Sequence, residues 1–428
     1  MTNHNPGTLT AGTLILGAGE AGLQLAVSLR QKGYTDPVTL IGAEDQPPYQ
    51  RPPLSKAFLS ADMDEDNLAL RTEDFYAENG IQVLTGTRIT DITLDEEGHG
   101  GVATTSRDHA ISFTKLALTT GSRPRKLNVP GKDLDCICYL RGIPDARSLR
   151  TRLAKASRVV VIGGGFIGLE AAAVARQRGL AVTVVETFDR LLQRVAAPPI
   201  SDFYKNAHER RGTQIILGSG VMALHGTNKK VSGVELSNGT IIPADLVIVG
   251  VGVEPRTELA EKLGLDCDRG IIVDNGARTS NPAIVAAGDC TIQPHPLYPA
   301  EKIRLESVQN AVDQAKIAAS SLLGEPRPTP AVPWFWSDQG DLKLQIAGLS
   351  NGYDDYLVRG EPDTEHFSVL YYRDGRLIAA DAVNSPHDFM AAKRALTMGA
   401  TIDHSIATNT DLPLKTLIGE PTTESLRN

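Results

Sequence analysis

The sequence predicts an α/β fold with two Rossmann-like domains and a smaller C-terminal α+β domain. Two strand–turn–helix–strand units, which begin at Thr13 and Arg158, each place a glycine-rich turn between the first strand and the helix. A third region, after the proline-rich joint at 324–330, combines strand patterns with one helix. Because 428 residues are too many for one hydrophobic core, we expect several domains. The expected boundaries are 8–122 with 250–327 as one interrupted domain, then 123–249 and 328–428.

The composition is that of an ordinary globular protein, with 41% apolar and 22% charged residues. The net charge of −8 argues against general nucleic-acid binding. No apolar run approaches the roughly 20 residues that span a bilayer, and Met1–Gly12 is polar without a signal-peptide core. The four cysteines form no C-x-x-C pair, so we expect reduced thiols in a cytoplasmic protein, and we expect no metal site.

The first unit has the pattern of a dinucleotide site. A strand at 14–16 runs into Gly17-Ala18-Gly19-Glu20-Ala21-Gly22, a helical pattern closed by Gly33, and a second strand at 38–41. Gly17 permits a tight turn, Gly19 lets the backbone approach a pyrophosphate, and Gly22 lets helix and strand pack closely. The helix N-terminus then faces the phosphates. Glu44 follows at roughly the 20-residue distance expected of an acid that accepts hydrogen bonds from a ribose.

The second unit repeats this pattern. A strand at 159–162 leads into a turn with Gly163, Gly165 and Gly168, a helix over 166–178 and a strand at 182–185 that ends in Glu186. A carboxylate there accepts hydrogen bonds from the adenosine 2′-hydroxyl and repels a 2′-phosphate, so it favours NADH over NADPH. Arg190 and Arg194 lie close by in the sequence and would soften that preference. Two such units indicate two nucleotides.

The segment from Asp45 to Lys56 contains four prolines, which disfavour regular secondary structure. Arg51 and Lys56 lie within it. A rigid loop with embedded cations suits the positioning of a ligand. The alternative is a solvated connector with two incidental charges.

Further elements follow from the apolar patterns and turn residues. We expect a helix at 73–79, strands at 81–84, 102–106 and 110–118, and strands between 213 and 249. Asn238-Gly239 predicts a hairpin turn with positive φ at both residues. The exits at 119–124 and 250–256 resemble each other, which suggests that the chain leaves the first domain at one and returns to it at the other.

The later part of the chain supplies one more candidate ligand. The strand at 284–286 ends in Gly288-Asp289 and presents a carboxylate where open α/β sheets bind ligands. The alternative, a helix cap, is disfavoured because the next helix begins only near Glu306. In the C-terminal domain we expect strands at 342–347, 367–372 and 376–380, an Asp374-Gly375 hairpin, a helix at 388–398 and a loosely held tail.

Together these motifs resemble the FAD-dependent, NADH-using ferredoxin reductases of bacterial oxygenase systems, which have the glutathione-reductase fold. The resemblance covers nearly the whole chain. It rests on the two glycine turns, on Pro48–Lys56, on Gly288-Asp289 and on Pro333-Trp334-Phe335-Trp336-Ser337-Asp338-Gln339. The Arg-Pro-Pro-Leu-Ser-Lys run at 51–56 is specific to this group and its apoptosis-inducing-factor relatives.

The resemblance implies that the first unit holds FAD and the second NADH. It implies that Arg51 contacts FAD, that Lys56 lies near flavin N5 paired with Glu170, and that Asp289 binds the ribityl chain. The helix from near Glu306 would direct its positive end at the flavin, where it stabilises the reduced anion. Trp336 resembles an aromatic residue that borders the flavin, with core packing as the alternative. The residues expected at FAD are Gly17, Gly19, Glu20, Ala21, Gly22, Glu44, Arg51, Lys56, Thr120, Gly121, Asp289, Glu306, Ser307, Val308 and Trp336. Those expected at NADH are Gly163, Gly165, Phe166, Ile167, Gly168, Glu186, Arg194 and Gly252.

The implied reaction is hydride transfer from NADH to flavin N5, followed by release of single electrons to a protein acceptor. The expected acceptor is a small acidic [2Fe–2S] ferredoxin that serves a P450 or a Rieske oxygenase. Lys56 and Glu170 would tune the charge beside N5. Arg71, Arg304 and Lys343 are the candidate docking cations, and the alternative is that they are ordinary solvated charges. We expect a monomer or a homodimer.

One difference from related flavoproteins argues against reactions that use cysteine thiols. Disulfide reductases of this fold place a cysteine pair on or soon after the first helix, whereas here no cysteine occurs before Cys136. A dithiol relay and single-cysteine peroxidase chemistry are therefore unsupported, and Cys290 is expected to serve packing. Two alternative functions remain. One is a redox-gated module like the apoptosis-inducing factor, and the other is reduction of a small molecule such as a quinone.

Overall fold

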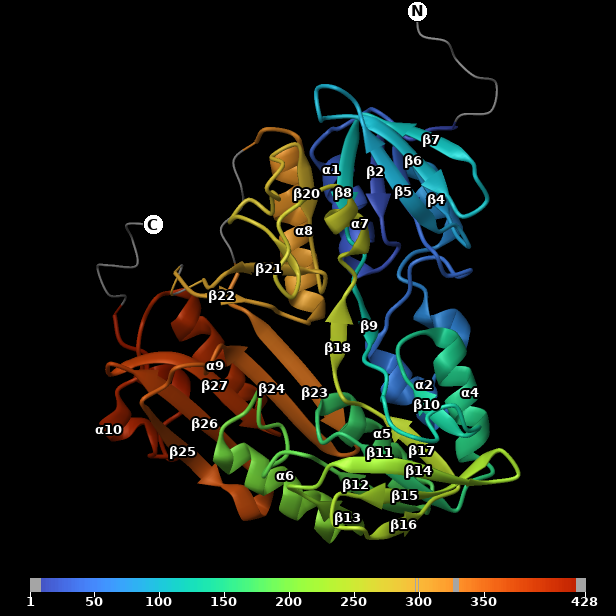
Figure 1. The fold of residues 1–428 in the computed structure, drawn as a ribbon. Coiled ribbons are helices and arrows are strands. Elements are labelled where there is room, and N and C mark those ends of the chain that lie inside the picture. The colour runs from blue at the N-terminus through green and yellow to red at the C-terminus, as the bar shows by residue number, and fades with distance from the viewer. Residues whose placement is uncertain (1–8, 297, 299, 326–330, 421–428) are drawn as a thin grey trace, which may run out of the picture. The chain divides into compact units, whose positions relative to one another are not determined.

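The computed structural model describes residues 9–296, 298, 300–325 and 331–420 (Figure 1). The chain divides into two compact units, each assembled from three separate segments. Unit 1 contains residues 1–50, 65–123 and 253–331, and unit 2 contains residues 51–64, 124–252 and 332–428. The chain thus passes from one unit to the other after residues 50, 64, 123, 252 and 331. Strands β9 (Ser122–Pro124) and β18 (Val253–Pro255) lie at two of these passages.

Unit 1 is built on a parallel sheet with the strand order β20-β8-β2-β3-β4. The strands are Ile284–Ala286, Lys115–Leu118, Thr13–Leu16, Val38–Ile41 and Ile81–Leu84 in that order. Alternate residues of β2 face two different cores, since Ile15 packs with helices α1 (Glu20–Gln31) and α8 (Val308–Leu322). Leu14 and Leu16 pack on the other side. Burial on both faces explains why these strands are apolar throughout rather than alternating.

The second face of that sheet is covered by a four-stranded sheet, β1-β7-β6-β5. These strands are Leu9–Thr10, Ala110–Phe113, Gly101–Thr105 and Ile89–Leu94. The remaining elements of unit 1 are η2 (Glu65–Leu68), α3 (Glu73–Glu78), α7 (Glu258–Lys262), β19 (Ile271–Ile272), β21 (Thr291–Pro294) and β22 (Lys302–Ile303).

Unit 2 contains a second parallel sheet, ordered β10-β17-β11-β12-β13. Its strands are Ile137–Tyr139, Leu246–Val249, Arg158–Ile162, Ala181–Val185 and Thr213–Ile216. The associated helices are η1 (Pro52–Ser55), α2 (Ala57–Ser60), α4 (Ile143–Leu153), α5 (Phe166–Gln177) and α6 (Pro198–Arg210). A small antiparallel sheet follows, formed by β14 (Val221–Thr227), β15 (Lys230–Leu236) and β16 (Ile241–Pro243).

The C-terminal part of unit 2 is an antiparallel sheet with the order β23-β24-β27-β26-β25. Its strands are Trp334–Gln339, Leu342–Gly348, Arg376–Val383, His366–Arg373 and Asp355–Glu361. Helix α9 (Pro386–Thr397) packs its apolar side against β24 and β27. The short elements η3 (Pro362–Thr364), α10 (His404–Ala407) and η4 (Leu414–Leu417) complete the fold. The fold is therefore of the predicted class, with two Rossmann-like α/β halves and an α+β C-terminal part.

Three local predictions need correction. The expected strand at 110–118 is two strands, because β7 and β8 belong to different sheets and the break falls at Thr114. The proline-rich segment is partly helical, since Pro52 and Pro53 occupy the first positions of η1, where the fixed φ of proline suits a helix start. At the predicted Asn238-Gly239 turn only Gly239 has a positive φ, 81°. The turn with two positive φ values is instead Asn228-Lys229 between β14 and β15.

Two further predictions, the proline-rich joint and the loosely held tail, concern residues that lie partly or wholly outside the described part of the chain. Residues 326–330 of the proline-rich joint and residues 421–428 of the tail lie outside the described part of the chain. Among the residues that the structure does describe, no helix is long and apolar enough to cross a membrane.

Candidate functional site

The first glycine turn, in unit 1, has the close packing that each glycine predicts. Gly17 has a φ of 121°, and a Cβ there would lie 2.0 Å from the carbonyl oxygen of Thr119. A Cβ on Gly22 would lie 2.0 Å from the carbonyl oxygen of Gly17. The Thr119 hydroxyl donates a hydrogen bond of 2.9 Å to that same oxygen and so braces the turn. Only glycine therefore fits at positions 17 and 22.

Gly19 differs from its neighbours because the space beside it is open. Apart from Gly19 and its two chain neighbours, no heavy atom of the described residues lies within 4 Å of where its Cβ would be, and no described side chain caps α1, which begins directly after it. The backbone N–H groups at Glu20, Ala21 and Gly22 are thus available to an anion, as a pyrophosphate requires. Burial raises the pKa of the Glu20 carboxyl, which the charge of Arg71 partly offsets.

The carboxylate of Glu44 is held at the end of β3. The buried Tyr49 hydroxyl donates a hydrogen bond of 2.5 Å to Glu44 Oε2. In the sheet, Leu16 is in register with Ile41 and with Leu118, so the ends of β2, β3 and β8 lie side by side. Glu44 and the glycine turn therefore share one edge of the sheet, which fits a dinucleotide with its phosphates at the turn and its ribose at the acid.

Asp289 lies at the same edge, after β20. The Ser122 hydroxyl donates a hydrogen bond of 3.0 Å to Asp289 Oδ2. The chain turns at Gly288, whose Cβ would lie 3.1 Å from the Ala21 side chain of α1, and the Gly288 N–H donates to Gln314 of α8 at 2.7 Å. Gln314 thus fixes the turn that presents Asp289, a role that the sequence reading missed.

Thr120 and Gly121 follow β8 at this edge. The Thr120 hydroxyl donates to the Arg256 carbonyl at 2.7 Å, and the Arg256 N–H donates to the Gly121 carbonyl at 2.9 Å. These bonds tie the two connecting segments of unit 1 together. Gly121 has a φ of 66°, which favours glycine at this position.

Helix α8 begins at Val308, with Ser307 as its N-cap. The Ser307 hydroxyl accepts a hydrogen bond of 3.1 Å from the Asn310 N–H. Glu306 precedes the cap and pairs with Arg304 at 2.9 Å. The positive end of a 15-residue helix therefore lies at these residues, and its role toward a flavin stays a prediction.

The second glycine turn, in unit 2, repeats the geometry of the first. Gly163 has a φ of 108°, and a Cβ there would lie 2.4 Å from the Gly250 carbonyl oxygen. A Cβ on Gly168 would lie 2.2 Å from the Gly163 carbonyl oxygen. At Gly165, the residue before α5, no described atom beyond its two chain neighbours lies within 4 Å of the Cβ position, and no described side chain caps the helix. This turn also fits a pyrophosphate.

Glu186 is fixed by two backbone donors. Its Oε2 accepts from the Gly164 N–H at 2.6 Å and its Oε1 accepts from the Phe188 N–H at 2.9 Å. Arg190 does not face the same space, because its guanidinium donates to Ala196, Gln193 and Ser201 in the segment before and at the start of α6. These bonds occupy the Arg190 guanidinium within its own segment, which argues against the expectation that it softens the coenzyme preference.

Arg194 and Gly252 lie beside each other. Arg194 is exposed, and its guanidinium Nη2 lies 3.4 Å from where a Cβ on Gly252 would be. Phe166, the first residue of α5, packs against Phe335 with ring centroids 4.7 Å apart, whereas Ile167 is 39% exposed. Arg194 and Ile167 are thus accessible groups near the second turn.

Lys56 and Glu170 meet in unit 2 as the resemblance implies. Lys56 Nζ lies 2.9 Å from Glu170 Oε2, and Glu170 is only 3% exposed. The Ser55 hydroxyl donates to Glu170 Oε2 at 2.5 Å and the Ser337 hydroxyl donates to Glu170 Oε1 at 2.6 Å. The sequence reading missed both serines, although each lies inside a motif that it quoted.

Arg51 and Trp336 also belong to unit 2. Arg51 Nη1 donates to the Arg141 carbonyl at 2.9 Å. Trp336 is half-buried in β23, where its ring lies 5.4 Å from that of Trp334. Neither contact assigns a role toward the flavin, so both roles stay predictions.

The candidate docking cations fall in different places. Arg71, in unit 1, stacks over the Phe75 ring at 5.2 Å. Arg304, also in unit 1, is paired with Glu306 and donates to the Arg269 carbonyl at 3.1 Å. Lys343 lies in β24 of unit 2 and is exposed.

The cysteines are not arranged for thiol chemistry. All four are free, and burial raises the thiol pKa of Cys290, and of Cys138 and Cys267 to about 11. Cys290 is fully buried, in agreement with the packing role expected of it. The thiolate form needed for nucleophilic attack is therefore disfavoured at these three residues.

Comparison with known proteins defines the class. Residues 12–315 match the family described as pyridine nucleotide-disulphide oxidoreductase, and residues 334–418 match a family described as reductase C-terminal. The first match spans more than half of the chain, so the chain belongs to the pyridine nucleotide-disulphide oxidoreductase family.

Individual relatives confirm the narrower resemblance to ferredoxin reductases. Rhodocoxin reductase of Rhodococcus erythropolis is 43% identical over 405 residues, which cover 95% of this chain and 94% of the relative. Putidaredoxin reductase of Pseudomonas putida is 40% identical over 410 residues, or 95% of this chain and 96% of the relative.

Solved structures agree. The ferredoxin reductase of the CYP199A2 system from Rhodopseudomonas palustris superposes with a TM-score of 0.91 at 41% identity, and covers 96% of this chain and 100% of its own. The reductase in the covalent putidaredoxin reductase–putidaredoxin complex also gives 0.91, at 38% identity, over 95% of this chain and 98% of its own.

Proposed function

We propose that this protein passes electrons from NADH, through bound FAD, to a small acidic [2Fe–2S] ferredoxin that serves a P450 or Rieske-type oxygenase in the cytoplasm. One observation carries the proposal. Two glycine turns and a C-terminal sheet occur in one chain. A reductase solved together with its putidaredoxin partner matches this arrangement over 95% of the chain.

Each cofactor is assigned to one of the domains expected from the sequence by the glycine turn that the domain contains. Residues 8–122 and 250–327 hold FAD, with the pyrophosphate at Gly19–Gly22, the ribose at Glu44 and the ribityl chain at Asp289. Residues 123–249 hold NADH, with the pyrophosphate at Gly165–Gly168 and the adenosine ribose at Glu186. Bound FAD supplies the chemistry of accepting a hydride and releasing electrons one at a time.

The chain's own residues set the charge around the flavin and stabilise its reduced form. The N-terminus of α8, capped by Ser307, directs partial positive charge at the flavin and favours its reduced form. Lys56 places an ammonium beside the flavin, and buried Glu170 holds that ammonium in place. No proton needs to leave either residue in this scheme, because their task is to set the local charge.

Docking of the ferredoxin is assigned to surface cations on a protein that is acidic overall; Arg71 and Lys343 are exposed and Arg304 is half-buried. We propose Arg71, Arg304 and Lys343 for this role. For Arg304 an acidic partner has to compete with Glu306, which holds the guanidinium at 2.9 Å. Arg71 and Lys343 are therefore expected to contribute more than Arg304.

The test is stopped-flow spectroscopy. Anaerobic mixing with NADH should bleach the flavin, and subsequent mixing with candidate [2Fe–2S] ferredoxins should reoxidise it while the iron–sulfur spectrum becomes that of the reduced state. A colourless protein that stays colourless after incubation with FAD would refute the proposal. Rapid reduction by NADH with turnover of a quinone but of no ferredoxin would favour the small-molecule reductase. A long-lived NADH charge-transfer complex with slow turnover of every acceptor would favour the redox-gated module.

A further inference from the structure

A line of buried polar side chains runs through unit 2 from Lys56 to His208. Beyond the Lys56–Glu170 pair it continues from Glu170 Oε1 to the Ser337 hydroxyl at 2.6 Å, and from there to Gln339 Nε2 at 3.3 Å. It ends where Gln339 Oε1 meets His208 Nε2 at 2.8 Å. The line thus joins four elements that are far apart in sequence, namely the segment after η1, α5, β23 and α6.

Between His208 and Glu170, each hydrogen bond of this line donates toward the carboxylate, and Lys56 donates to the same carboxylate from the other end. Because the Gln339 amide nitrogen donates to Ser337, its oxygen faces His208, and His208 must donate through Nε2. The Ser337 hydroxyl, with Gln339 as its donor, is free to give its own proton to Glu170. Each donor therefore supports the carboxylate at the end of the line, and chains of this kind polarise one another in a low dielectric.

Burying this line of polar side chains costs free energy, which indicates that the line has a function. Ser337, Gln339 and His208 are at most 2% exposed, and burial lowers the pKa of His208, which keeps the imidazole neutral. Apolar side chains of the same size would fill this space without the need for matched hydrogen bonds. The charges on the line are then those of Lys56 and Glu170 at its far end.

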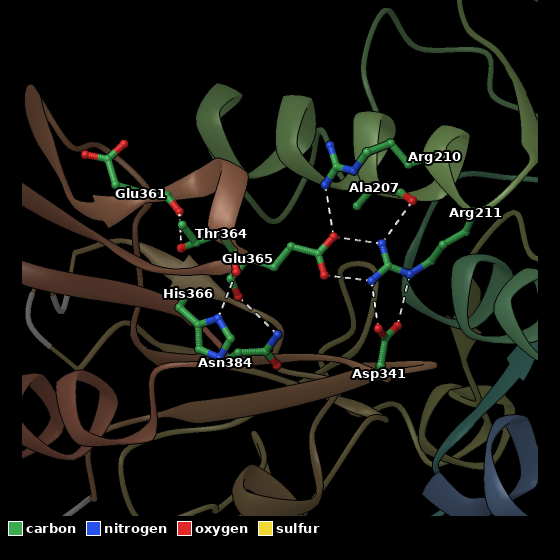
Figure 2. A network of polar contacts seen from close by, with 9 residues as sticks. All are labelled: Ala207, Arg210, Arg211, Asp341, Glu361, Thr364, Glu365, His366 and Asn384. Atoms are coloured by element: carbon green, nitrogen blue, oxygen red, sulfur yellow. Dashed lines mark hydrogen bonds and ion pairs between the residues drawn. The ribbon is translucent and has the colours of Figure 1, made fainter.

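A second network fixes the outer end of the line (Figure 2). Arg211, three residues after His208, uses all five of its N–H donors, on Asp341, Glu365 and the Ala207 carbonyl. Asp341 lies in the turn directly after Gln339. The network therefore joins the end of α6 to the β23–β24 turn, close in the sequence to His208 and Gln339.

We propose that Ser337, Gln339 and His208 are positioning residues that hold Glu170, and through it the Lys56 ammonium, in one place. The proposal rests on the proposed function in one respect, namely that Lys56 lies beside the flavin. Loss of a donor to Glu170 Oε1 leaves a buried carboxylate oxygen without its partner, so the carboxylate can turn and no longer holds the Lys56 ammonium beside the flavin. The flavin then has less positive charge beside it, and its reduction becomes harder.

The test compares four variants of the FAD-loaded protein with the parent. Ser337→Ala removes the direct donor, and Gln339→Met removes the next link at similar volume. Ser337→Thr keeps the hydroxyl and should rescue. Tyr204→Phe is the matched control, because Tyr204 is buried on α6 one turn before His208 and its hydroxyl has no hydrogen-bond partner among the described residues.

Three readouts are expected to move together. With Ser337→Ala the limiting rate of flavin reduction by NADH should fall about tenfold, as for loss of one hydrogen bond to a charged group, at unchanged half-saturating NADH. A tenfold change in the two-electron equilibrium corresponds to a flavin midpoint potential lower by about 30 mV. Acetylation of Lys56 by acetic anhydride, followed by peptide mass spectrometry with exposed Lys343 as internal reference, should become faster. Gln339→Met should show smaller changes in the same directions, and Ser337→Thr and Tyr204→Phe should match the parent.

The proposal is overturned when Ser337→Ala and Gln339→Met match Tyr204→Phe in potential and in Lys56 acetylation. Lys56→Met separates this failure from failure of the proposed function. A potential that moves in Lys56→Met but not in the other variants leaves Lys56 at the flavin and removes the positioning role. Faster acetylation of Lys56 in Ser337→Ala and Gln339→Met establishes the positioning role. If the flavin potential is nevertheless unchanged in these variants and in Lys56→Met, Lys56 does not lie beside the flavin.

Discussion

Glu186 shows how the backbone orients a single side chain. Two backbone N–H groups, from Gly164 and Phe188, orient its carboxylate. The neighbouring Arg190 is occupied by acceptors of its own segment. The Glu186 carboxylate, and not the Arg190 guanidinium, is therefore expected to decide the coenzyme.

We expect Glu186→Ala to reduce the preference for NADH over NADPH by about tenfold or more in kcat/KM, because a charged hydrogen bond to the ribose is lost and the repulsion of a 2′-phosphate disappears. Arg190→Ala should leave the preference unchanged. Steady-state kinetics with both coenzymes and a fixed acceptor measure this. A change of preference in Arg190→Ala comparable to that in Glu186→Ala would contradict the assignment.

The residues of the candidate site differ in how far the sequence reveals them. Gly17, Gly22 and Gly168 were predictable because a side chain there collides with backbone a few residues away or on the next strand, a local requirement that repeats in every such turn. Ser337 and Gln339 were not, because their partners are Glu170 and His208, far away in sequence. A hydrogen bond of that kind depends on how elements pack, which no local pattern encodes.

At the scale of elements, the best-predicted parts are the two strand–turn–helix units. Their strands are buried on both faces and their helices begin at glycine, so periodicity and turn chemistry agree. The strand β5 was missed because a bulge between Ile89 and Asp91 interrupts its alternation. The strand β25 was missed because it is an edge strand whose inward residues include the charged Arg359. Alternation of apolar and polar residues with a period of two therefore identifies neither β5 nor β25.

Glycine substitutions in the second turn separate folding from binding. Gly165→Ala should leave the melting temperature near that of the parent, because the Cβ meets open space and φ is −86°. It should nevertheless raise KM for NADH about tenfold or more, since the methyl group occupies the place of the pyrophosphate. Calorimetry and stopped-flow titration with NADH provide the two measurements.

Gly168→Ala is the matched comparison for that prediction. Its Cβ would lie 2.2 Å from the Gly163 carbonyl oxygen, so the strand and helix have to separate and the melting temperature should fall. If Gly165→Ala bound NADH as well as the parent does, the assignment of this turn to the pyrophosphate would be wrong.

The network around Arg211 gives a pH dependence of stability. Hydrogen bonds from Arg211 and Arg210 lower the pKa of Glu365 from 4.5 to about 2. A lowered folded-state pKa stabilises the fold above the unfolded value, so the contribution is complete above pH 4.5 and is lost as the pH falls toward 2. Glu365→Gln should lower the free energy of unfolding by about 2 kcal/mol at pH 7, with a difference that shrinks below pH 4.5.

Urea unfolding followed by tryptophan fluorescence at pH 7, 4.5 and 3.5 measures this difference. The exposed neighbour Glu361 provides the control, because Glu361→Gln should have almost no effect at any of these values. A difference for Glu365→Gln that stays constant over this range would show that the pairing with Arg211 is not its cause.

For the whole molecule, the net charge of −8 constrains how an acidic partner approaches. Attraction has to come from local cations, and such attraction is screened by salt. The second-order rate constant for ferredoxin reduction should therefore fall about tenfold or more between 50 and 500 mM salt. Reduction of a neutral quinone should change little. Lys343→Glu should weaken both the rate and its salt dependence, and equal salt responses of the two acceptors would contradict protein docking.

The interleaving of the two units has a consequence for the order in which the protein is made. Unit 1 receives its edge strand β20 and helix α8 only from residues 284–322, after much of unit 2 has been translated. Unit 2 in turn needs the strands beyond residue 332. A nascent chain that stalls at mid-length therefore carries two unfinished cores, each with apolar faces that the missing C-terminal residues would have covered. Such a fragment should depend on chaperones and be degraded quickly, whereas a chain of two consecutive domains would already have released one folded body.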